Sequence, residues 1–244
     1  MKEKVGVIGA GRFGQVLMEI LSEDFEVHYY DQQTIELNLE NVHQVAIQEA
    51  TSLETIFLCV PIVHFESALR EIAPIINPNA TVLDVLSVKV FANQTLEKLL
   101  PATNTIIPTH PMFGPFSIKE GREDLPFVFC PTERSGDKLK VWTQYFASKS
   151  FNIVEMTCDE HDQMTAHTLC VSQMIGRLLE PLDLKFTSID TPHHFNLVRL
   201  ADIARSDSWE LFEAIQTYNP YAKDMHNQLR SRLNGLVEGF EYKL

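Results

Sequence analysis

Short apolar runs alternate with amphipathic segments over the first 155 residues. The apolar runs are rich in β-branched side chains and have the length of buried strands, and they cover residues 5–8, 26–30, 55–60, 81–86, 105–107, 127–130 and 152–155. Helical periodicity fills several of the intervals, at residues 13–21, 65–72 and 137–147. This alternation predicts an α/β domain built on a doubly wound parallel sheet with helices on both faces.

The pattern changes after about residue 155. Strand-like runs nearly vanish, and helical patterns cover residues 161–179, 196–218 and 221–240. We therefore predict two domains, a sheet-containing domain over residues 1–155 and an all-helical domain over residues 156–244. The helical part is rich in Leu, Ile and Phe for so short a segment, so we expect it to pack against a second copy as a homodimer.

Composition and charge narrow the possible partners. Of the 244 residues, 45% are hydrophobic and 22% are charged, which is an ordinary globular balance. The formal net charge of −13 repels nucleic acids and anionic membrane surfaces, so we expect neither as a partner. The longest strongly apolar run, residues 56–63, is too short to cross a bilayer, and the first residues lack the pattern of a signal peptide. We predict a cytoplasmic protein.

Two cysteine–histidine pairs have a spacing that occurs in metal sites. Cys158 is followed by His161, and His167 is followed by Cys170. On one continuous helix, at about 100° per residue, Cys158 and His167 point in opposite directions, as do His161 and Cys170. Four ligands on opposite faces cannot converge on one ion unless the helix breaks, so we predict no metal site.

A glycine-rich run, Gly9-Ala10-Gly11-Arg12-Phe13-Gly14, joins the first predicted strand to the first predicted helix. This context matters, because glycine triplets also occur in ordinary turns. Gly9 permits a tight turn, Gly11 leaves room for a pyrophosphate, and Gly14 allows the helix to pack closely on the strand. The N-terminus of the helix then offers unpaired N–H groups to the phosphates. The run predicts a dinucleotide-binding domain of the Rossmann type.

Asp31 ends the second predicted strand, at the place where such domains meet the ribose. Its carboxylate can accept hydrogen bonds from the ribose 2′-hydroxyl and repels a 2′-phosphate, which favours NAD over NADP. Arg12 is a basic residue in the glycine-rich turn and keeps NADP possible. The predicted cofactor site also includes Phe13, Val60 and Pro61.

Polar side chains follow two further predicted strands. Ser87 and Lys89 come after the fourth, and His110 comes after the fifth. Because ligands of open parallel sheets lie beyond the carboxyl ends of the strands, we expect these three side chains to face one crevice. Pro108 and Pro111 restrict the backbone around His110 and present its imidazole rigidly. A serine after a strand is also common as a helix N-cap, and Lys89 can hold a carboxylate or be a solvated charge.

These residues occur in runs that resemble the prephenate/arogenate dehydrogenase family. The runs are the glycine-rich turn, Ser87-Val88-Lys89, His110-Pro111-Met112-Phe113-Gly114-Pro115, the stretch 124–129 and His161-Asp162. The resemblance is closest to the plant-type arogenate enzymes. It implies a Rossmann domain, a helical dimerisation domain and a substrate cleft between them. It also implies the oxidative decarboxylation of prephenate or arogenate in tyrosine biosynthesis, with NAD or NADP as the cofactor.

The resemblance also implies roles for individual residues. His110 accepts a hydrogen bond and then the proton from the C4 hydroxyl of the cyclohexadienyl ring, hydride leaves C4 for the nicotinamide, and the ring carboxylate departs as CO2. Ser87 orients that hydroxyl and His110. Histidine suits this task because its usual pKa makes it a base near neutral pH. Lys89 and Gly114 complete this part of the predicted site as substrate contacts.

The helical pattern over residues 161–179 has an apolar face and a second, more polar face. Such a face suits either the wall of a cleft or a solvated surface. Gln173 and Arg177 lie four residues apart on it and project together, and we predict that both contact the substrate, with Arg177 as a ligand for its carboxylate. The chain departs from the family here, because most members carry a histidine where Gln173 stands. The arginine with which many bacterial members bind the carboxylate has no evident match, and Arg199 and Arg205 flank its place.

Two other functions fit parts of the pattern. A dehydrogenase of another small hydroxy acid has the same two-domain plan, but such enzymes rely on a lysine in the first helix of the helical domain, and residues 159–179 contain none. A non-catalytic, NAD-binding regulatory protein would account for Gln173 and for the missing arginine. Turnover of prephenate or arogenate, followed through the reduced cofactor, distinguishes the three functions.

Overall fold

The computed structural model describes residues 2–114 and 117–240. The chain forms two compact units, Met1–His161 and Asp162–Leu244, and the division between them falls inside one helix, α6 (Cys158–His167). The boundary expected at residue 155 is the last residue of strand β8 (Asn152–Glu155). All the strands in the described ranges therefore belong to the first unit.

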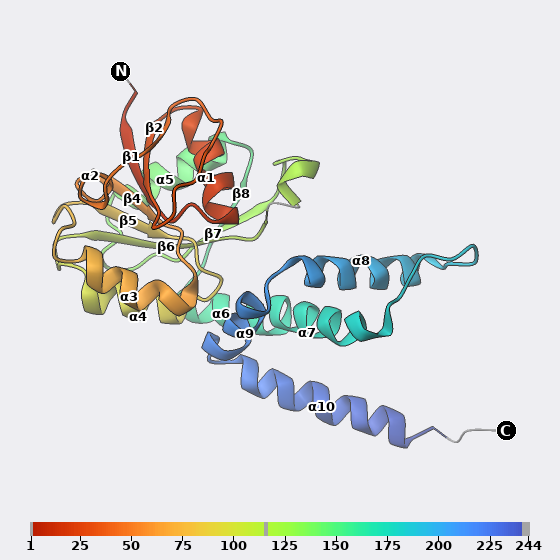
Figure 1. The fold of residues 1–244 in the computed structure, drawn as a ribbon. Helices are drawn as coiled ribbons and strands as arrows, with labels where there is room; N and C mark the ends of the chain where they lie inside the picture. The colour runs from red at the N-terminus through yellow and green to blue at the C-terminus, as the bar shows by residue number, and fades with distance from the viewer. Residues whose placement is uncertain (1, 115–116, 241–244) are drawn as a thin grey trace. The chain divides into compact units, whose positions relative to one another are not determined.

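The first unit is built on one eight-stranded sheet with the order β3-β2-β1-β4-β5-β6-β7-β8 (Figure 1). Every neighbouring pair of strands is parallel except β6 and β7, which are antiparallel. The other strands are β1 (Lys4–Ile8), β2 (Glu26–Tyr30), β3 (Val42–Gln44), β4 (Thr55–Leu58), β5 (Thr81–Asp84), β6 (Thr105–Pro111) and β7 (Pro126–Phe129). The predicted fold class, a doubly wound α/β sheet followed by an all-helical segment, is confirmed.

Two strands differ from the sequence pattern. β3 has no counterpart among the predicted strands, because it is only three residues long and its side chains are partly or fully exposed. β6 continues past its predicted end, because antiparallel pairing with β7 places His110 opposite Val128 and Pro111 opposite Phe127. His110 therefore lies within the strand, next to its last residue, rather than beyond its end.

Helices cover both faces of this sheet (Figure 1). α1 (Arg12–Ser22) and α5 (Lys138–Ser148) lie on one face, and α3 (Ile62–Ile72) and α4 (Lys89–Leu99) lie side by side on the other. α4 and the short α2 (Ile47–Thr51) are not among the predicted helices. Under α1 and α5, Trp142 meets the ring of Phe57 edge-on, with the ring centroids 5.0 Å apart. Aromatic groups of this kind bury about 150–250 Å² each and dominate the energy of such a core.

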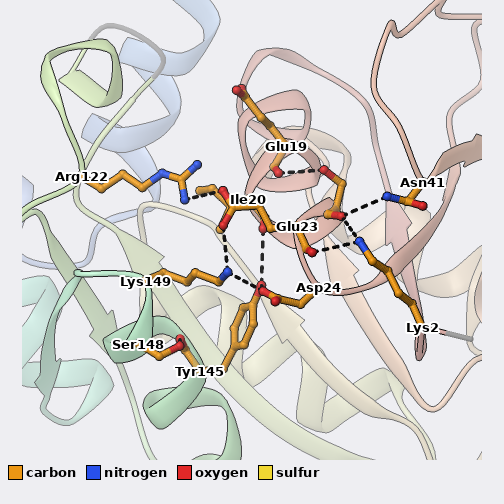
Figure 2. Close-up of polar contacts among 11 residues, drawn as sticks. Lys2, Glu19, Ile20, Glu23, Asp24, Asn41, Arg122, Tyr145, Ser148 and Lys149 are labelled. Atoms are coloured by element: carbon orange, nitrogen blue, oxygen red, sulfur yellow. Dashed lines mark hydrogen bonds and ion pairs between the residues drawn. The ribbon is translucent and has the colours of Figure 1, made fainter.

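Ionic contacts join the end of α1 to the end of α5 and to the connection that follows the turn η1 (Ser117–Glu120) (Figure 2). The Glu23 carboxylate lies 2.7 Å from the Arg122 guanidinium and 2.8 Å from the Lys149 ammonium. Lys2 donates hydrogen bonds to carbonyls at the end of α1, where helical partners run out. Because these groups are partly exposed, each pair contributes only about 0–1 kcal/mol, and its effect is local.

The second unit is helical. It contains most of α6, followed by α7 (Leu169–Leu179), the turn η2 (Glu180–Leu182), α8 (Pro192–Ser206), α9 (Trp209–Tyr218) and α10 (Ala222–Glu238). α7 and α8 approach closely at Gly176, where an added Cβ would lie 2.5 Å from the Cβ of Ala204. No helix in the described ranges is both long enough and apolar enough to cross a membrane.

Two predicted helices are interrupted. The pattern over residues 161–179 breaks at Thr168, which has φ −114° and ψ −75° and donates its hydroxyl to the Met164 carbonyl at 2.9 Å. The pattern over residues 196–218 divides at the N-cap of α9, Ser208. Because the helix breaks at Thr168, the two cysteine–histidine pairs do not lie on one continuous helix, and the angle calculated between them does not apply. Among the residues that the structure describes, no group of three or more His, Cys, Asp or Glu side chains could hold a metal ion.

Candidate active site

The glycine-rich turn between β1 and α1 leaves no space for a side chain at Gly9 and Gly14 and leaves open space at Gly11. Gly9 has φ +100°, and a Cβ there would lie 2.5 Å from the carbonyl oxygen of Cys59. A Cβ on Gly14 would lie 2.4 Å from the carbonyl oxygen of Gly9. By contrast, nothing in the described structure lies within 4 Å of a Cβ built on Gly11, where α1 begins without a side-chain cap. The turn therefore has room for a ligand beside the uncapped end of α1.

Asp31 lies directly after β2 and contacts this turn. One of its carboxylate oxygens accepts a hydrogen bond from the Ala10 N–H at 2.8 Å, and the other accepts one from the Gln33 N–H at 2.9 Å. A carboxylate has about four lone-pair sites, so both oxygens keep acceptor capacity for a ribose hydroxyl. The open space at Gly11, the N-terminus of α1 and this carboxylate together fit a dinucleotide.

The other residues of the predicted cofactor site surround the turn. Arg12 is exposed at the start of α1, and Phe13 is half-buried against the aromatic core. The backbone nitrogen of Val60 lies 3.2 Å from the Cβ built on Gly9, and Pro61 is exposed just before α3. The end of β4 thus borders the glycine-rich turn.

His110 and His161 form a buried pair of imidazoles. His110 is 6% exposed on β6, and His161 is 1% exposed on α6. Nδ1 of His110 lies 2.8 Å from Nε2 of His161, so one ring donates a hydrogen bond and the other accepts it. Nε2 of His110 makes no hydrogen bond with any residue that the structure describes. When Nδ1 carries the ring proton, Nε2 is an acceptor for a ligand.

The surroundings of His110 keep its imidazole neutral. Burial lowers the pKa of His110 well below the ordinary value of 6.5, and the neighbouring His161 and Lys89 lower this pKa further. At pH 7 the ring is therefore uncharged and able to accept a proton. The sequence argument expects a base whose pKa lies near neutrality. The structure corrects that expectation, because a buried ring beside a cation is a weaker base.

Ser87 and Gly114 lie near the ends of the strands that flank this pair. Ser87 is half-buried in the loop between β5 and α4, and its hydroxyl makes no hydrogen bond with the described residues. β5 and β6 are parallel, with Asp84 opposite Pro108, so Ser87 and His110 both follow this paired position at the same edge of the sheet. Gly114, after β6, is half-buried, and nothing described lies within 4 Å of a Cβ built on it.

Lys89 points into the first unit. Its side chain is fully buried, and its ammonium pairs with the Asp84 carboxylate and donates a hydrogen bond to the carbonyl oxygen of Thr109 at 2.5 Å. This position differs from both expectations for Lys89, a contact with the substrate and a solvated charge. The physical reason is that Asp84, the last residue of β5, supplies an internal partner for the cation.

Gln173 and Arg177, on α7, both bind one residue of the second unit, Asp207. The Gln173 amide donates to the Asp207 carboxylate at 3.2 Å, and the Arg177 guanidinium donates to the Asp207 backbone carbonyl at 2.7 Å. Arg177 also lies over the Trp209 ring, 5.4 Å from its centroid. The side-chain oxygen of Gln173 is buried and accepts no hydrogen bond from the described residues. A buried acceptor in that state indicates a place for a ligand donor or a water molecule.

His161 and Asp207 take part in these arrangements and are absent from the predicted site residues. The His161-Asp162 pair belongs to the family resemblance, but nothing in the sequence links it to His110, which lies 51 residues earlier. Asp207 lies between α8 and α9, where the sequence pattern indicates one continuous helix. No signal in the pattern marks it.

A doubly wound sheet whose glycine-rich turn meets a carboxylate after the second strand defines a dinucleotide-binding domain. Residues 20–154, more than half of the chain, match the family model described as prephenate dehydrogenase, nucleotide-binding domain. The chain therefore belongs to the prephenate dehydrogenase family. Residues 178–244 match a second family model, described as TYRAAT1-like, C-terminal domain.

Two similar proteins come from Arabidopsis thaliana. The chain is 31% identical to arogenate dehydrogenase 1, chloroplastic, over 233 residues, which make up 91% of this chain and 36% of the relative. It is 32% identical to arogenate dehydrogenase 2, chloroplastic, over 242 residues, which make up 93% of this chain and 66% of the relative. The chain thus spans little more than a third of the first relative and just under two-thirds of the second.

Solved structures share the fold. The prephenate dehydrogenase of A. aeolicus, in complex with hydroxyphenyl propionate and NAD+, has a TM-score of 0.75 at 18% identity and covers 98% of this chain and 90% of its own. Synechocystis arogenate dehydrogenase has a TM-score of 0.71 at 22% identity and covers 96% of this chain and 91% of its own. At such identities the likeness concerns the fold alone.

Proposed function

We propose that the protein is an NAD(P)-dependent dehydrogenase that oxidatively decarboxylates arogenate or prephenate in tyrosine biosynthesis. The observation that carries this proposal is the neutral, buried imidazole of His110, whose Nδ1 is held by His161 and whose Nε2 has no partner among the described residues. A ring in that state can take a proton from a hydroxyl group. The family membership and the names of the two Arabidopsis relatives support the same reaction.

The glycine-rich turn and its neighbours would hold the cofactor. The N–H groups at the start of α1 would bind the pyrophosphate beside Gly11, and the Asp31 carboxylate would accept hydrogen bonds from the ribose. Asp31 favours NAD, because a carboxylate repels a 2′-phosphate, whereas the exposed Arg12 keeps NADP possible. When bound, either dinucleotide supplies the acceptor for the hydride that leaves C4 of the substrate.

His110 moves the proton in this mechanism. As C4 is oxidised, Nε2 of His110 accepts the proton of the C4 hydroxyl, and the half-buried Ser87 hydroxyl orients that group. The bond to the ring carboxylate then breaks, CO2 leaves, and the electron pair of that bond makes the ring aromatic. The phenolate oxygen recovers the proton from Nε2, so His110 ends in its starting state. A positioned base of this kind contributes about 10²–10⁴-fold to the rate.

We propose that Asp207 contacts the amino group of the substrate, and we therefore favour arogenate over prephenate. Arogenate carries an ammonium group where prephenate carries a keto oxygen. Gln173 donates to the Asp207 carboxylate and Arg177 donates to the Asp207 backbone carbonyl, so a carboxylate lies beside the predicted substrate contacts. A carboxylate attracts an ammonium group and offers nothing to a keto oxygen, which is only an acceptor.

We also propose that the protein forms a homodimer through its second unit. This unit exposes large apolar side chains, including Leu178, Leu182, Phe186, Ile189, Phe195, Trp209, Leu233 and Leu236. Apolar surface of this extent marks a site of association. Light scattering after gel filtration checks the proposal, and a mass of 27.8 kDa at micromolar concentration would contradict it. The cytoplasmic location remains a prediction, which cell fractionation tests.

The activity assay combines the purified protein with NAD or NADP and with arogenate or prephenate, and follows the absorbance of the reduced cofactor. We expect turnover, and we expect His110→Asn to lower kcat by about 10²–10⁴-fold while dinucleotide affinity is unchanged. Full activity of His110→Asn would exclude His110 as the base. Dinucleotide binding with no turnover of any hydroxy acid would favour a non-catalytic NAD-binding protein, and turnover of another hydroxy acid would favour a different dehydrogenase.

A further inference from the structure

A buried cation lies directly behind the strand that carries His110. The Lys89 side chain is fully buried, and its ammonium bridges the Asp84 carboxylate and the carbonyl oxygen of Thr109. The Thr109 hydroxyl donates back to the Asp84 backbone carbonyl at 2.5 Å, and the Leu86 N–H donates to the Asp84 carboxylate at 2.9 Å. These contacts join β5, α4 and β6 at one place.

Stability does not explain this arrangement well. Removing two charges from water carries a large desolvation cost, and an apolar pair of similar volume is often as stable or more stable. The network is also incomplete, because the second oxygen of the Asp84 carboxylate is buried and accepts no hydrogen bond from the described residues. Buried ionic groups that are not optimal for stability are frequent beside functional sites.

The position of the cation relates it to the imidazole. The carbonyl group that Lys89 holds belongs to the peptide bond between Thr109 and His110, so fixing this carbonyl fixes the plane from which His110 projects. On its other edge the same segment pairs with β7, where His110 lies opposite Val128. The backbone of His110 is therefore held by the Lys89 ammonium on one side and by the strand ladder on the other.

We propose that Lys89 is a positioning residue of the reaction, which fixes the peptide plane that carries His110 and places a buried positive charge directly behind it. The catalytic part of this role rests on the proposed function. The lowered pKa of His110 agrees with it, since Lys89 contributes to that shift after burial and His161. Because a proton acceptor must be unprotonated before the reaction begins, a fixed cation acts in the same direction as burial and His161, toward the neutral ring.

Several titratable groups face this region from the surrounding elements. They are His161 and Cys158 on α6, Asp84 on β5, Lys89 on α4 and Cys130 after β7. The Cys130 thiol contacts the Cys158 thiol, and this contact and burial raise the pKa of Cys130, so it stays uncharged at neutral pH. A change in the charge at Lys89 is therefore expected to act on the His110 imidazole directly.

The test is an NMR titration of the protein labelled with 15N-histidine, in which the His110 signal is the one missing from His110→Asn. In Lys89→Met we expect the His110 pKa to rise toward 6.5, because the cation is gone. Thr109→Val is the matched control, since it breaks the hydroxyl bond to Asp84 and leaves the charge of Lys89 in place. That control should lower stability without moving the His110 pKa.

Kinetics give the second readout. In Lys89→Met we expect kcat to fall by about 10–100-fold with little change in KM, since misplacement of a catalytic group acts on the chemical step. The acid limb of the kcat/KM profile should move to higher pH, whereas a merely structural role would leave this limb in place. In the control Thr109→Val, the acid limb of the kcat/KM profile should not move, because the charge of Lys89 is kept.

A second variant covers the case in which Lys89→Met does not fold. The pair Asp84→Leu/Lys89→Met removes both charges and replaces them with apolar groups. A His110 pKa in these variants that equals the wild-type value would overturn the proposal, and failure of both to fold would assign Lys89 a structural role instead. The titration needs no substrate, so an unmoved pKa defeats this proposal, whereas a wild-type protein without turnover defeats the proposed function.

Discussion

The imidazoles of His110 and His161 meet in a T-shaped arrangement, with Nδ1 of His110 2.8 Å from Nε2 of His161 and an angle of 69° between the ring planes. Because the contact uses Nδ1, the other nitrogen of His110 is left for a ligand. His161 thus determines which nitrogen of His110 meets the substrate and how the ring is turned.

Replacement of His161 should therefore slow the reaction without abolishing it. In His161→Phe the ring of His110 loses its hydrogen-bonding partner and its fixed tautomer, and we expect kcat to fall by about 10–100-fold, as for other groups that orient a reacting histidine. His161→Gln keeps an amide that can bond to Nδ1 and should lose less. Steady-state kinetics with arogenate measure both variants. Equal activity of His161→Phe and the wild type would contradict this role.

The lowered pKa of His110 predicts how stability depends on pH. The folded state holds His110 neutral, whereas the unfolded chain protonates it with a pKa near 6.5, so the unfolded state binds more protons as pH falls. The stabilisation is fully present above pH 6.5 and is lost as pH falls from 6.5 through the folded pKa. We expect a loss of up to about 1.4 kcal/mol per pH unit in that window.

Urea unfolding at closely spaced pH values from neutral to mildly acidic measures this dependence. His110→Asn is the control, because it cannot titrate, and its stability should fall less steeply over the same window. Parallel pH profiles of the two proteins would show that His110 is not held neutral.

Two glycines of one turn should respond differently to the same substitution. Gly14→Ala places a Cβ 2.4 Å from the Gly9 carbonyl oxygen, and we expect it to destabilise the fold by about 1–3 kcal/mol. Gly11→Ala meets nothing within 4 Å in the described structure, so the fold should be unaffected. Its Cβ enters the space assigned to the pyrophosphate, so dinucleotide affinity should fall by about tenfold or more, that is, by 1.4 kcal/mol.

Thermal unfolding and titration with NAD separate these two effects. If Gly11→Ala bound NAD as tightly as the wild type, the pyrophosphate would have to lie elsewhere.

Asp31 should control the choice between the two dinucleotides. Asp31→Ser removes the negative charge that repels a 2′-phosphate, so the ratio of kcat/KM for NADP to that for NAD should rise. The substitution also weakens the hydrogen bond to the Ala10 N–H, so some loss with both cofactors is expected. Asp31→Asn removes the charge and keeps an acceptor for that N–H, which makes it the matched control. An unchanged ratio in both variants would refute the assignment.

Asp207 should control the choice between the two substrates. Asp207→Asn keeps the size of the side chain and removes its charge, so the preference for arogenate over prephenate should fall by about 10–100-fold, the equivalent of one charge-assisted hydrogen bond. The comparison uses kcat/KM for both substrates in the same preparation. A preference that survives the substitution would place the ammonium of arogenate somewhere else.

The fold was largely open to prediction because its strands and helices repeat a simple alternation, and because the glycine-rich turn marks where β1 meets α1. The exceptions have local causes. β3 is too short and too exposed to leave an apolar run, and the helix over residues 161–179 breaks at Thr168, a residue whose hydroxyl competes for a helical carbonyl. Propensity alone does not reveal that competition.

The sequence predicted those residues of the candidate site that lie within a recognisable motif, and it did not predict contacts between distant positions. His110 and Ser87 stand in recognisable runs, whereas the contact of His110 with His161 joins positions 51 residues apart. Lys89 stands in one of those runs too, but its burial depends on Asp84, whose position as an internal partner becomes visible only once β5 and β6 are paired. Contacts between residues that are far apart in the sequence fix the positions of these side chains. The periodicity of the sequence does not predict such contacts.

The antiparallel pairing of β6 with β7 separates changes that would move His110 from changes in the segment before β7 that would not. His110 sits in a segment with β5 on one side and β7 on the other, so its coordinates are tied to the ladder of the sheet. Residues 117–123, which precede β7, lie outside that ladder, and their length and chemistry can vary without disturbing the imidazole. Descendants of such a protein could exchange one substrate for another and keep the same acid–base apparatus.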